Sequence, residues 1–358
     1  MARVAGAARC TRSSAAREHT INQYSLLEEL GRGTYCTVRR AQDREGAEYA
    51  VKALSRAVLS SRQVSLFTRE GAQAVPLQTR VDTELRILGD HPHPHVVGLV
   101  EVIDDPALDT LYVVLEGMRG GQLMEWSDDH SAYGARSEPS QASVLVYQEA
   151  AAAALLGQLL TAVAHLHGHG IIHKDLKPDN VLLGLPVPAA DPRLVRPLPA
   201  RGAAEGAKAC PEAPTADGAL RELVRQCGFV AKVADFNTAV VCALPDCHIW
   251  DAEGTQQFTP PECFDPQRDG AILGQPRDMW SVGCLLFAML FGRCPFWDEE
   301  PIRLQLALLA FAMDKAAAVD VPGGVVSPQA EDLIRQLLRK DPAGRPLAAA
   351  ALQHPWVL

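Results

Sequence analysis

A helix-forming run that ends in a dense group of polar side chains constrains the fold of this chain more than any other feature. Residues 148–167 read QEAAAAALLGQLLTAVAHLH, and their alanines and leucines strongly favour a helix. The segment IIHKDLKPDN follows at 171–180 and places basic, acidic and amide groups directly behind two isoleucines. A solvated turn can have this composition, and so can a catalytic loop. Other parts of the sequence have to distinguish the two.

The bulk composition indicates a folded protein whose partners are neither nucleic acid nor membrane. The chain has 358 residues, of which 47% are hydrophobic and 22% are charged, so most of it should be globular. The net charge of −9 argues against nucleic acid, because phosphate binding depends on clustered Lys and Arg. The best uninterrupted apolar run, VGCLLFAMLF at 282–291, suits a buried helix and is too short for a membrane span.

The N-terminal segment and the cysteines bear on localisation. Residues 1–23 are predicted to be a disordered basic tail, and their composition also fits an organelle transit peptide. The nine cysteines are dispersed and form no CxxC pair. Cys242 and Cys247 are close, but nothing elsewhere completes a zinc site. We therefore expect reduced thiols in an intracellular protein that is cytoplasmic, with the nucleus as an alternative.

The hydrophobic periodicity changes along the chain and predicts an α+β fold with two lobes. From Tyr24 short alternating runs surround a glycine turn, as in an antiparallel sheet, and one helix is predicted at 79–88. After Gly120 the pattern is mostly helical. We expect a small, mostly-β N-lobe at about 24–118 and a larger, mostly-α C-lobe at about 119–357. A Pro-, Ala- and Gly-rich segment at 184–227 is predicted to be a flexible insert without a packed element, and 127–147 a shorter insert.

Two features of the first lobe are compatible with a nucleotide-phosphate site. The turn LGRGTYCTV at 30–38 has glycines that let backbone N–H groups approach phosphate oxygens, although ordinary hairpins contain such turns too. Lys52 lies in the apolar strand YAVKAL at 49–54, where an inward position would require a partner such as Glu84. A surface lysine on an edge strand is the alternative.

The polar segment at 171–180 has a companion downstream. Asp235 ends the apolar strand VADFN at 233–237, and its carboxylate with the Asn180 amide would make a pair of oxygen ligands for Mg²⁺. Asp175 could then accept a proton from an attacking hydroxyl.

These motifs, followed by TPPE at 259–262, DMWSVG at 278–283 and Arg345, resemble a eukaryotic protein kinase in order and spacing over residues 24–357. The resemblance implies the bilobal kinase fold and MgATP as the phosphate donor. Asp175 is implied to be the catalytic base, Lys177 to steady the γ-phosphate, and Asn180 and Asp235 to hold Mg²⁺. The implied ATP-binding residues are Leu30, Gly31, Gly33, Val38, Ala50, Lys52, Glu84, Glu116, Met118 and Leu182.

The same resemblance implies several supporting roles. Leu115 would be the gatekeeper before a hinge at 116–118, and Asp278 would hold the catalytic loop from below. Glu262 and Arg345 would form an ion pair that braces the large lobe. Lys177, two residues after the base, is the form found in serine/threonine kinases.

Three positions depart from the kinase pattern. The third glycine of the phosphate loop is Cys36, and the glycine after Asp235–Phe236 is Asn237. Asn is the non-glycine residue that best tolerates left-handed backbone angles, so Asn237 need not disable the metal loop. The residue before the base is Lys174 where the family usually has Arg, and the base itself is kept.

Three stretches are similar to the calcium/calmodulin-dependent protein kinase kinases and related upstream activators of AMP-activated-type kinases. They are 93–126, FGRCPFWDEE at 291–300 and the terminal HPWV, and the long stretch from Lys52 to Glu84 matches the place of an insert in that subfamily. The resemblance implies a protein substrate, namely the activation loop of another kinase. A downstream calmodulin-dependent or AMP-activated-type kinase and a pseudokinase scaffold are the alternatives. Because no basic amphipathic helix follows the last kinase motif in this sequence, calmodulin is not expected to bind it.

The segment between the metal loop and TPPE predicts that Lys174 is paired permanently with a carboxylate. Residues 239–254 contain no Ser, Thr or Tyr, so a phosphorylation switch has no acceptor there. Lys174 would pair instead with one of the acids Asp246, Asp251 or Glu253. The alternative is that these acids are solvated, since exposed pairs contribute only about 0–1 kcal/mol. Thr255 matches the threonine that bridges the base and the neighbouring lysine in the family.

Overall fold

The computed structural model describes residues 3–5, 10–12, 19–33, 35–128, 131–135, 145–185, 195–197, 230–244, 247–265, 270–314 and 316–358. The chain forms two compact units, which we call unit 1 (Met1–Arg119) and unit 2 (Gly120–Leu358). Their boundary lies close to the one predicted at 118–119. Each unit is described by itself.

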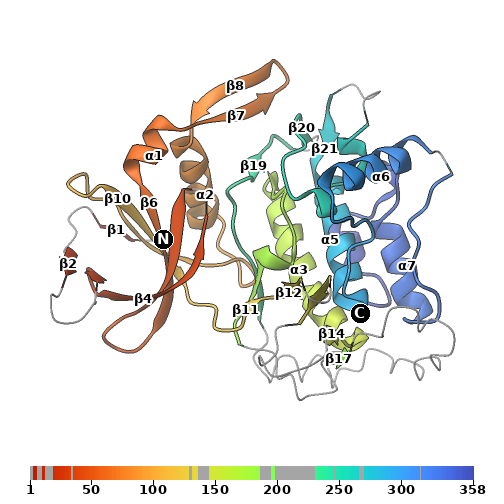
Figure 1. Ribbon diagram of the computed structural model, residues 1–358, viewed down its shortest axis with the longest axis horizontal. Coiled ribbons are helices and arrows are strands. Elements are labelled where there is room, and N and C mark those ends of the chain that lie inside the picture. Colours follow the sequence, from red (N-terminus) through yellow and green to blue (C-terminus); the bar gives the residue numbers. More distant parts are fainter. Residues whose placement is uncertain are drawn as a thin grey trace. The chain divides into compact units, whose positions relative to one another are not determined.

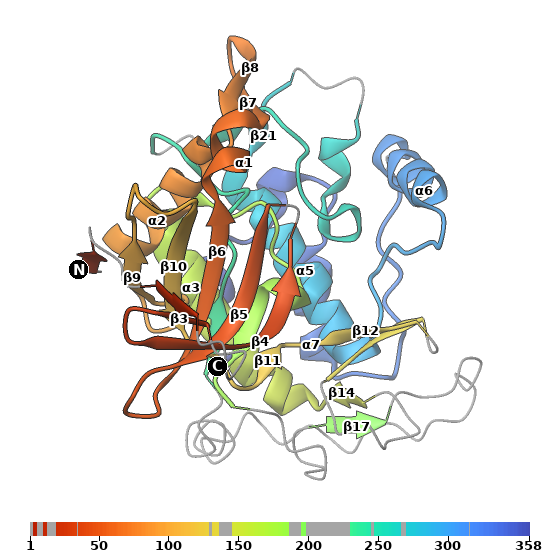
Figure 2. The same ribbon diagram turned by 60° about the vertical axis from the view of Figure 1, so that its left-hand side comes forward.

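Unit 1 is built on a sheet with the strand order β1-β9-β10-β6-β5-β4-β3-β2 (Figures 1 and 2). All neighbouring strands in this sheet are antiparallel except β1 and β9, which are parallel. The strands of the sheet are β1 (Arg3–Ala5), β2 (Cys10–Arg12), β3 (His19–Ile21), β4 (Tyr24–Arg32), β5 (Cys36–Gln42), β6 (Glu48–Ser55), β9 (Leu99–Ile103) and β10 (Thr110–Glu116).

The core of unit 1 follows from alternation along these strands. Side chains at every second position point to one face of a sheet, and here they meet in one hydrophobic cluster. Its buried members are Ile21, Tyr24, Leu26, Ala41, Val51, Ile103, Tyr112 and Val114. The cluster fixes the register of the strands, because a slip by one residue would turn the apolar side chains out of the core.

The segment predicted to be a disordered tail contains strands. β1 pairs with β9, and β2 pairs with β3, which in turn pairs with β4. Ile21 of β3 is fully buried, so the sheet begins before the predicted boundary at Tyr24. The edge of a sheet offers unpaired backbone N–H and C=O groups, and backbone pairing depends little on side-chain type. The other residues of the predicted tail before His19 lie outside the described residues.

The long stretch between Lys52 and Glu84 is ordered. It contains α1 (Arg56–Ser61) and an antiparallel hairpin of β7 (Gln63–Thr68) and β8 (Gly71–Pro76), labelled in Figure 1. Helix α2 (Gln78–Asp90) follows and confirms the helix predicted at 79–88. It turns one face, including Val81, Glu84, Ile87 and Leu88, into the unit.

Unit 2 is mostly helical. The α-helices among its described residues are α3 (Glu149–Gly168), α5 (Gly274–Phe291), α6 (Pro301–Met313), α7 (Pro328–Leu337) and α8 (Ala348–Ala351). Its short 3₁₀ helices are η1 (Pro178–Asn180), η2 (Gln256–Phe258), η3 (Pro261–Cys263) and η4 (Pro342–Gly344). Its strands are β11 (Gly121–Gln122), β12 (Glu125–Ser127), β13 (Ala132–Gly134), β14 (Leu145–Tyr147), β15 (Ile171–Ile172), β16 (Val181–Leu183), β17 (Val195–Pro197), β18 (Ala231–Val233), β19 (Val240–Val241), β20 (His248–Ile249) and β21 (Ile272–Leu273).

Helices α3 and α5 form the centre of unit 2 and pack against each other. Almost every residue of α5 is buried, which explains why its sequence is apolar on all sides. Among the described residues, α3 alone is long and apolar enough to cross a membrane by length and composition. Most of α3 is buried inside the unit, as in the core helix of a globular domain.

Two segments predicted to be inserts contain short strands. β12 pairs with β13, and β14 pairs with β17, which lies within the segment 184–227. The prediction that this segment forms no packed element is therefore wrong at Val195–Pro197. Three-residue strands pair through their backbone, so proline- and alanine-rich composition conceals them. Residues 186–194 and 198–227 lie outside the described residues.

Candidate active site

The unit 1 part of the site centres on an ion pair between Lys52 of β6 and Glu84 of α2. The Lys52 Nζ lies 2.7 Å from the Glu84 Oε1, and both side chains are largely buried. The pair was expected from the kinase resemblance. It explains how an apolar strand accommodates a lysine, because a partner offsets the cost of burying its charge.

The register of the sheet brings other predicted residues to the same face as Lys52. Val38 of β5 lies opposite Lys52, and Leu115 of β10 lies opposite Ala50. Because opposite residues in a sheet point to one face and positions 50 and 52 share a face, these side chains surround the lysine. Leu30 is exposed at the end of β4.

Few side chains cover the backbone of the glycine turn. Gly31 lies opposite Val38, and a Cβ added to Gly31 would meet no atom within 4 Å. The backbone N–H of Gly33 donates to the carbonyl of Cys36 at 2.9 Å, which closes the turn. Cys36, at the position of the third family glycine, is partly buried. An open backbone of this kind suits contact with phosphate oxygens.

Residues 116–118, predicted to be the hinge, begin at the last residue of β10. The Glu116 Oε1 accepts a hydrogen bond from the backbone N–H of Gly98 at 2.6 Å. A Cβ at Gly117 would lie 2.6 Å from the carbonyl oxygen of Glu48, so only glycine fits there. These contacts fix the course of the backbone up to Met118, which is partly buried.

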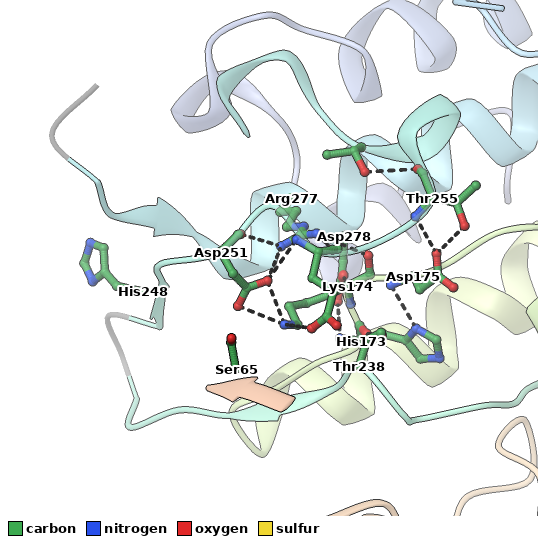
Figure 3. A network of polar contacts seen from close by, with 12 residues as sticks. Ser65, His173, Lys174, Asp175, Thr238, His248, Asp251, Thr255, Arg277 and Asp278 are labelled. Atoms are coloured by element: carbon green, nitrogen blue, oxygen red, sulfur yellow. Dashed lines mark hydrogen bonds and ion pairs between the residues drawn. The ribbon is translucent and has the colours of Figure 1, made fainter. Parts of the chain in front are cut away.

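In unit 2, the Asp175 carboxylate is the centre of a compact group of hydrogen bonds. Its Oδ1 accepts from the backbone N–H of Thr255 at 2.9 Å and from the Thr255 hydroxyl at 2.7 Å (Figure 3). The Lys177 Nζ lies 3.3 Å from the Asp175 Oδ2 and donates to the Thr255 hydroxyl oxygen at 2.8 Å. The Asn180 amide donates to the Asp175 Oδ2 at 3.1 Å. Asp175, Lys177 and Thr255 are thus arranged as the kinase resemblance implies.

The surroundings keep Asp175 ionised. Burial acts to raise the pKa of its carboxyl, but the Lys177 charge and the hydrogen bonds from Thr255 outweigh burial and hold that pKa below the ordinary value. The group is therefore an acceptor at neutral pH, as a general base must be.

Asn180 and Asp235 are linked through the backbone. The N–H of Ala234, next to Asp235, donates to the carbonyl of Asn180 at 2.9 Å. The Asn180 side-chain nitrogen donates to Asp175, so the side-chain amide oxygen of Asn180 remains as an acceptor. An amide oxygen and a carboxylate are suitable ligands for Mg²⁺, so these residues fit the metal that the resemblance implies.

The left-handed backbone at the metal loop is at Asp235, with φ of 63°, and not at Asn237. The Asn237 side-chain amide instead donates to the Asp235 Oδ2 at 3.2 Å. The replacement of glycine by Asn237 therefore contributes a hydrogen bond that orients the carboxylate.

Asp278 of α5 holds the catalytic loop as expected. Its Oδ2 accepts from the backbone N–H of His173 at 2.9 Å, and its Oδ1 from that of Lys174 at 3.0 Å. His167 Nε2 lies 2.9 Å from the same carboxylate. Burial acts to raise the pKa of the Asp278 carboxyl, but these contacts, led by His167, outweigh burial and lower that pKa.

Lys174 pairs with acids of the segment between the metal loop and TPPE. Its Nζ lies 2.8 and 2.9 Å from the two carboxylate oxygens of Asp251 and 3.4 Å from the Glu253 Oε2. The predicted pairing is therefore present for Asp251 and Glu253. Asp246, the third acid considered, lies outside the described residues.

A bidentate ion pair braces the C-terminal part of unit 2. Arg345 Nη1 and Nη2 donate to the two Glu262 carboxylate oxygens at 2.6 and 2.7 Å. The Arg345 guanidinium also lies over the Trp280 ring, 4.9 Å from its centroid. Both members of this pair were predicted.

The cysteines differ from the expectation of reduced thiols. Cys242 and Cys247 form a disulfide, while Cys284 and Cys294 are free and buried. The expectation rested on the absence of a paired cysteine pattern. It failed because two cysteines five residues apart can be reduced or bonded, and their spacing alone does not distinguish the two.

The comparisons with known proteins agree with this geometry. A model of the protein kinase domain matches residues 24–193 and 221–357. The chain belongs to the protein kinase family.

A curated relative gives the same family. The kinase chain is 30% identical over 342 residues to the calcium/calmodulin-dependent protein kinase type II subunit delta of Oryctolagus cuniculus. The match covers 94% of this chain and 49% of the relative, so the chain spans about half the length of that protein. The family and the relative together support a serine/threonine protein kinase domain with the bilobal fold.

The predicted site residues of this kinase divide between the units. Unit 1 carries the glycine turn, Lys52, Glu84 and residues 116–118, and unit 2 carries Leu182 of β16 with the catalytic and metal residues. Within unit 2, sequence reasoning missed Arg277 and His167. The clue for Arg277 was an Arg-Asp pair in an otherwise apolar helix, where a charge needs buried partners.

Proposed function

We propose that this chain is a serine/threonine protein kinase that transfers the γ-phosphate of ATP to a hydroxyl of a protein. The observation that carries the proposal is the contact of Asp175 with both Thr255 and Lys177, 2.7 and 3.3 Å away. These residues supply an ionised acceptor, a cation and a threonine that holds them together.

The chemistry assigned to the residues is a direct phosphoryl transfer. The substrate hydroxyl oxygen forms the new bond to the γ-phosphorus while the bond from that phosphorus to the ADP oxygen breaks, and the hydroxyl proton passes to Asp175. Lys177, within reach of Asp175, offsets charge on the transferred phosphate. Asn180 and Asp235 would hold Mg²⁺, which supplies positive charge at the phosphates when bound.

The ATP contacts are assigned by family likeness. Lys52, oriented by Glu84, would contact the α- and β-phosphates, and the backbone of the glycine turn would cover them. The hinge residues Glu116 and Met118 would bind adenine. The charged residues of the kinase set are all present, which argues against a pseudokinase scaffold.

For the substrate, we propose the activation loop of another kinase. Support comes from the sequence stretches similar to the calcium/calmodulin-dependent protein kinase kinases and from the ordered α1 and β7–β8 segment where that subfamily carries an insert. A second candidate is a downstream kinase that phosphorylates other proteins. The likeness to a calcium/calmodulin-dependent protein kinase type II subunit favours this second candidate.

A substrate panel tests these proposals. The purified full chain is assayed with MgATP on several kinases that are inactivated at their own catalytic aspartate, and on short peptides taken from their activation loops. The upstream role predicts faster phosphorylation of the folded kinases, at activation-loop sites identified by mass spectrometry. Preference for peptides or for other sites would favour the downstream role. Calcium-loaded calmodulin is added in a parallel series to detect dependence on it.

Point variants test whether the measured kinase activity belongs to this chain or to a contaminating kinase. Asp175→Asn should lower kcat by about 10²–10⁴-fold, because the base positions and deprotonates the hydroxyl. Asp320→Asn, an exposed carboxylate in the same unit, is the matched control and should keep its turnover. A wild-type chain that binds MgATP but phosphorylates nothing in the panel would favour the scaffold instead.

A further inference from the structure

A buried anion site lies beside the catalytic loop of unit 2. The Asp251 carboxylate contacts Lys174 through both oxygens, and its Oδ1 lies 3.7 Å from the Arg277 Nη1 (Figure 3). The exposed fractions of the Asp251, Lys174 and Arg277 side chains are 8%, 2% and 0%. One carboxylate is thus enclosed by two cations that water hardly reaches.

The contacts of Arg277 extend along the same segment. Its guanidinium donates to the backbone carbonyls of Asp251, at 3.1 Å, and of Glu253. It also donates to the carbonyl of Lys174 at 3.4 Å. Arg277 therefore ties the backbone of residues 251–253 to the catalytic loop. Glu253, whose side chain is 34% exposed, adds the second carboxylate near Lys174.

The anion site is connected to the catalytic base by short stretches of strained or restricted backbone. Lys174, the neighbour of Asp175, has φ of 68°, a left-handed conformation that costs free energy in a non-glycine residue. Gly254 has φ of 138°, and a Cβ there would lie 2.6 Å from the Lys174 carbonyl oxygen. The next residue, Thr255, donates two hydrogen bonds to Asp175. Moving Asp251 would therefore displace Thr255 and the base.

We propose that Asp251, held by Lys174 and Arg277, is a positioning residue that replaces a regulated phosphate. In kinases that switch by phosphorylation, a phosphate on the activation segment pairs with cations and orders that segment. Here a carboxylate of the chain itself occupies such a site permanently, and residues 239–254 contain no hydroxyl that could be phosphorylated. The kinase domain is thus in its working arrangement without modification. This inference rests on the proposed kinase function.

The test uses the full chain, produced in bacteria, treated with a broad phosphatase and confirmed by mass spectrometry to be unmodified at Thr238, Thr255 and Thr259. We expect this protein to phosphorylate its substrate as fast as the untreated protein. Asp251→Asn should lower kcat by about 10–100-fold, because a shift of about 1 Å in a catalytic group has this effect. The MgATP dissociation constant should change less than about threefold, because Lys52 and Glu84 are untouched; a merely structural defect would change both.

A matched control neutralises another carboxylate of an ion pair. Glu331→Gln, in the exposed pair of Glu331 with Arg335 on α7, should leave kcat unchanged. If Asp251→Asn does not fold, hydrogen exchange of residues 247–259 in the wild-type chain tests the proposal instead. Equal protection before and after phosphatase treatment is expected, and loss of protection on dephosphorylation would overturn the proposal.

The outcomes separate this inference from the kinase assignment. Wild-type activity that disappears on dephosphorylation and returns with phosphate on one of the three threonines would overturn the fixed-acid inference and leave the kinase function in place. Normal kcat in folded Asp251→Asn would do the same. No turnover of any substrate in either state would overturn both.

Discussion

Two lysine–carboxylate pairs in this kinase chain have the same chemistry and different surroundings. In unit 1 the side chains of Lys52 and Glu84 are 13% and 9% exposed, and the carboxylate joins a strand to a helix. In unit 2 the side chains of Lys174 and Asp251 are 2% and 8% exposed, and Arg277 adds a second cation. The first lysine is the more accessible of the two.

The difference indicates two distinct uses of a buried charge. A lysine that must contact a nucleotide phosphate needs one face open to it, and its carboxylate partner only sets its direction. A lysine enclosed on all sides can act only on the chain around it. In these two pairs, burial and the number of charged partners differ although the residue types are alike.

The largest expected effect concerns the accessible pair. Lys52→Met should lower kcat by about 100-fold or more, because a cation directed at the phosphates is lost. Arg44→Met, an exposed turn residue in the same unit, is the control for loss of a positive charge. Steady-state kinetics with MgATP measure both variants. Near-normal turnover of Lys52→Met would remove the distinction between the two lysines.

The next prediction compares the carboxylates in stability. Asp251→Asn should reduce the free energy of unfolding by about 3–5 kcal/mol, because two buried cations lose their shared anion. Glu84→Gln should cost less, because the lysine it leaves behind is more accessible to water. Urea unfolding followed by tryptophan fluorescence measures both. Equal losses would mean that the Arg277 contact adds nothing to the Asp251 site.

The stability of the catalytic loop should depend on pH through Asp175 and Asp278. The pKa values of Asp175 and Asp278 lie below the ordinary value in the folded chain, so the stability they contribute is fully present above about pH 4. It should be lost as the pH falls through their folded pKa values. Hydrogen exchange of residues 171–180 over the range from about pH 5 to 3 follows this loss, after correction for the intrinsic exchange rate. Asp278→Asn should flatten the profile, and an unchanged profile would contradict the assignment.

The smallest effect is expected at the surface. The Glu331 and Arg335 side chains are 30% and 48% exposed and 2.6 Å apart, so Glu331→Gln should change the free energy of unfolding by less than about 1 kcal/mol. A loss comparable to that of Asp251→Asn would show that burial does not set the scale.

The sequence predicted the contacts that depend on the charged side chains themselves. The Lys52–Glu84 and Glu262–Arg345 pairs and the contacts of Asp278 were expected from residue types at family spacing. The pairing of Lys174 was expected from the acids of residues 239–254. Arg277 was not, because its role depends on backbone carbonyls at 251 and 253, which have no side-chain signature. The left-handed φ of Asp235 was missed for the same reason. The kinase motif shows that a glycine is replaced by Asn237, but it does not show which residue nearby adopts the unusual φ.

The fold was predicted to the level of its lobes and main helices. The short strands at the N-terminus and at Val195–Pro197 were not, because three-residue strands are held by backbone hydrogen bonds and need no alternating pattern. The β7–β8 hairpin was equally invisible, since most of its residues are exposed on both faces and it has no apolar period.

The disulfide between Cys242 and Cys247 has a mechanical consequence for the segment that carries Asp251. Strand β19, just before Cys242, pairs with β15 next to the catalytic loop, and β20, just after Cys247, pairs with β21 at the start of α5. The covalent bond holds the two Cα atoms 5.2 Å apart. A pull on either strand is therefore transmitted to the other through a tether of fixed length. While the bond is intact, Cys242 and Cys247 cannot separate, so β19 and β20 stay tethered to each other.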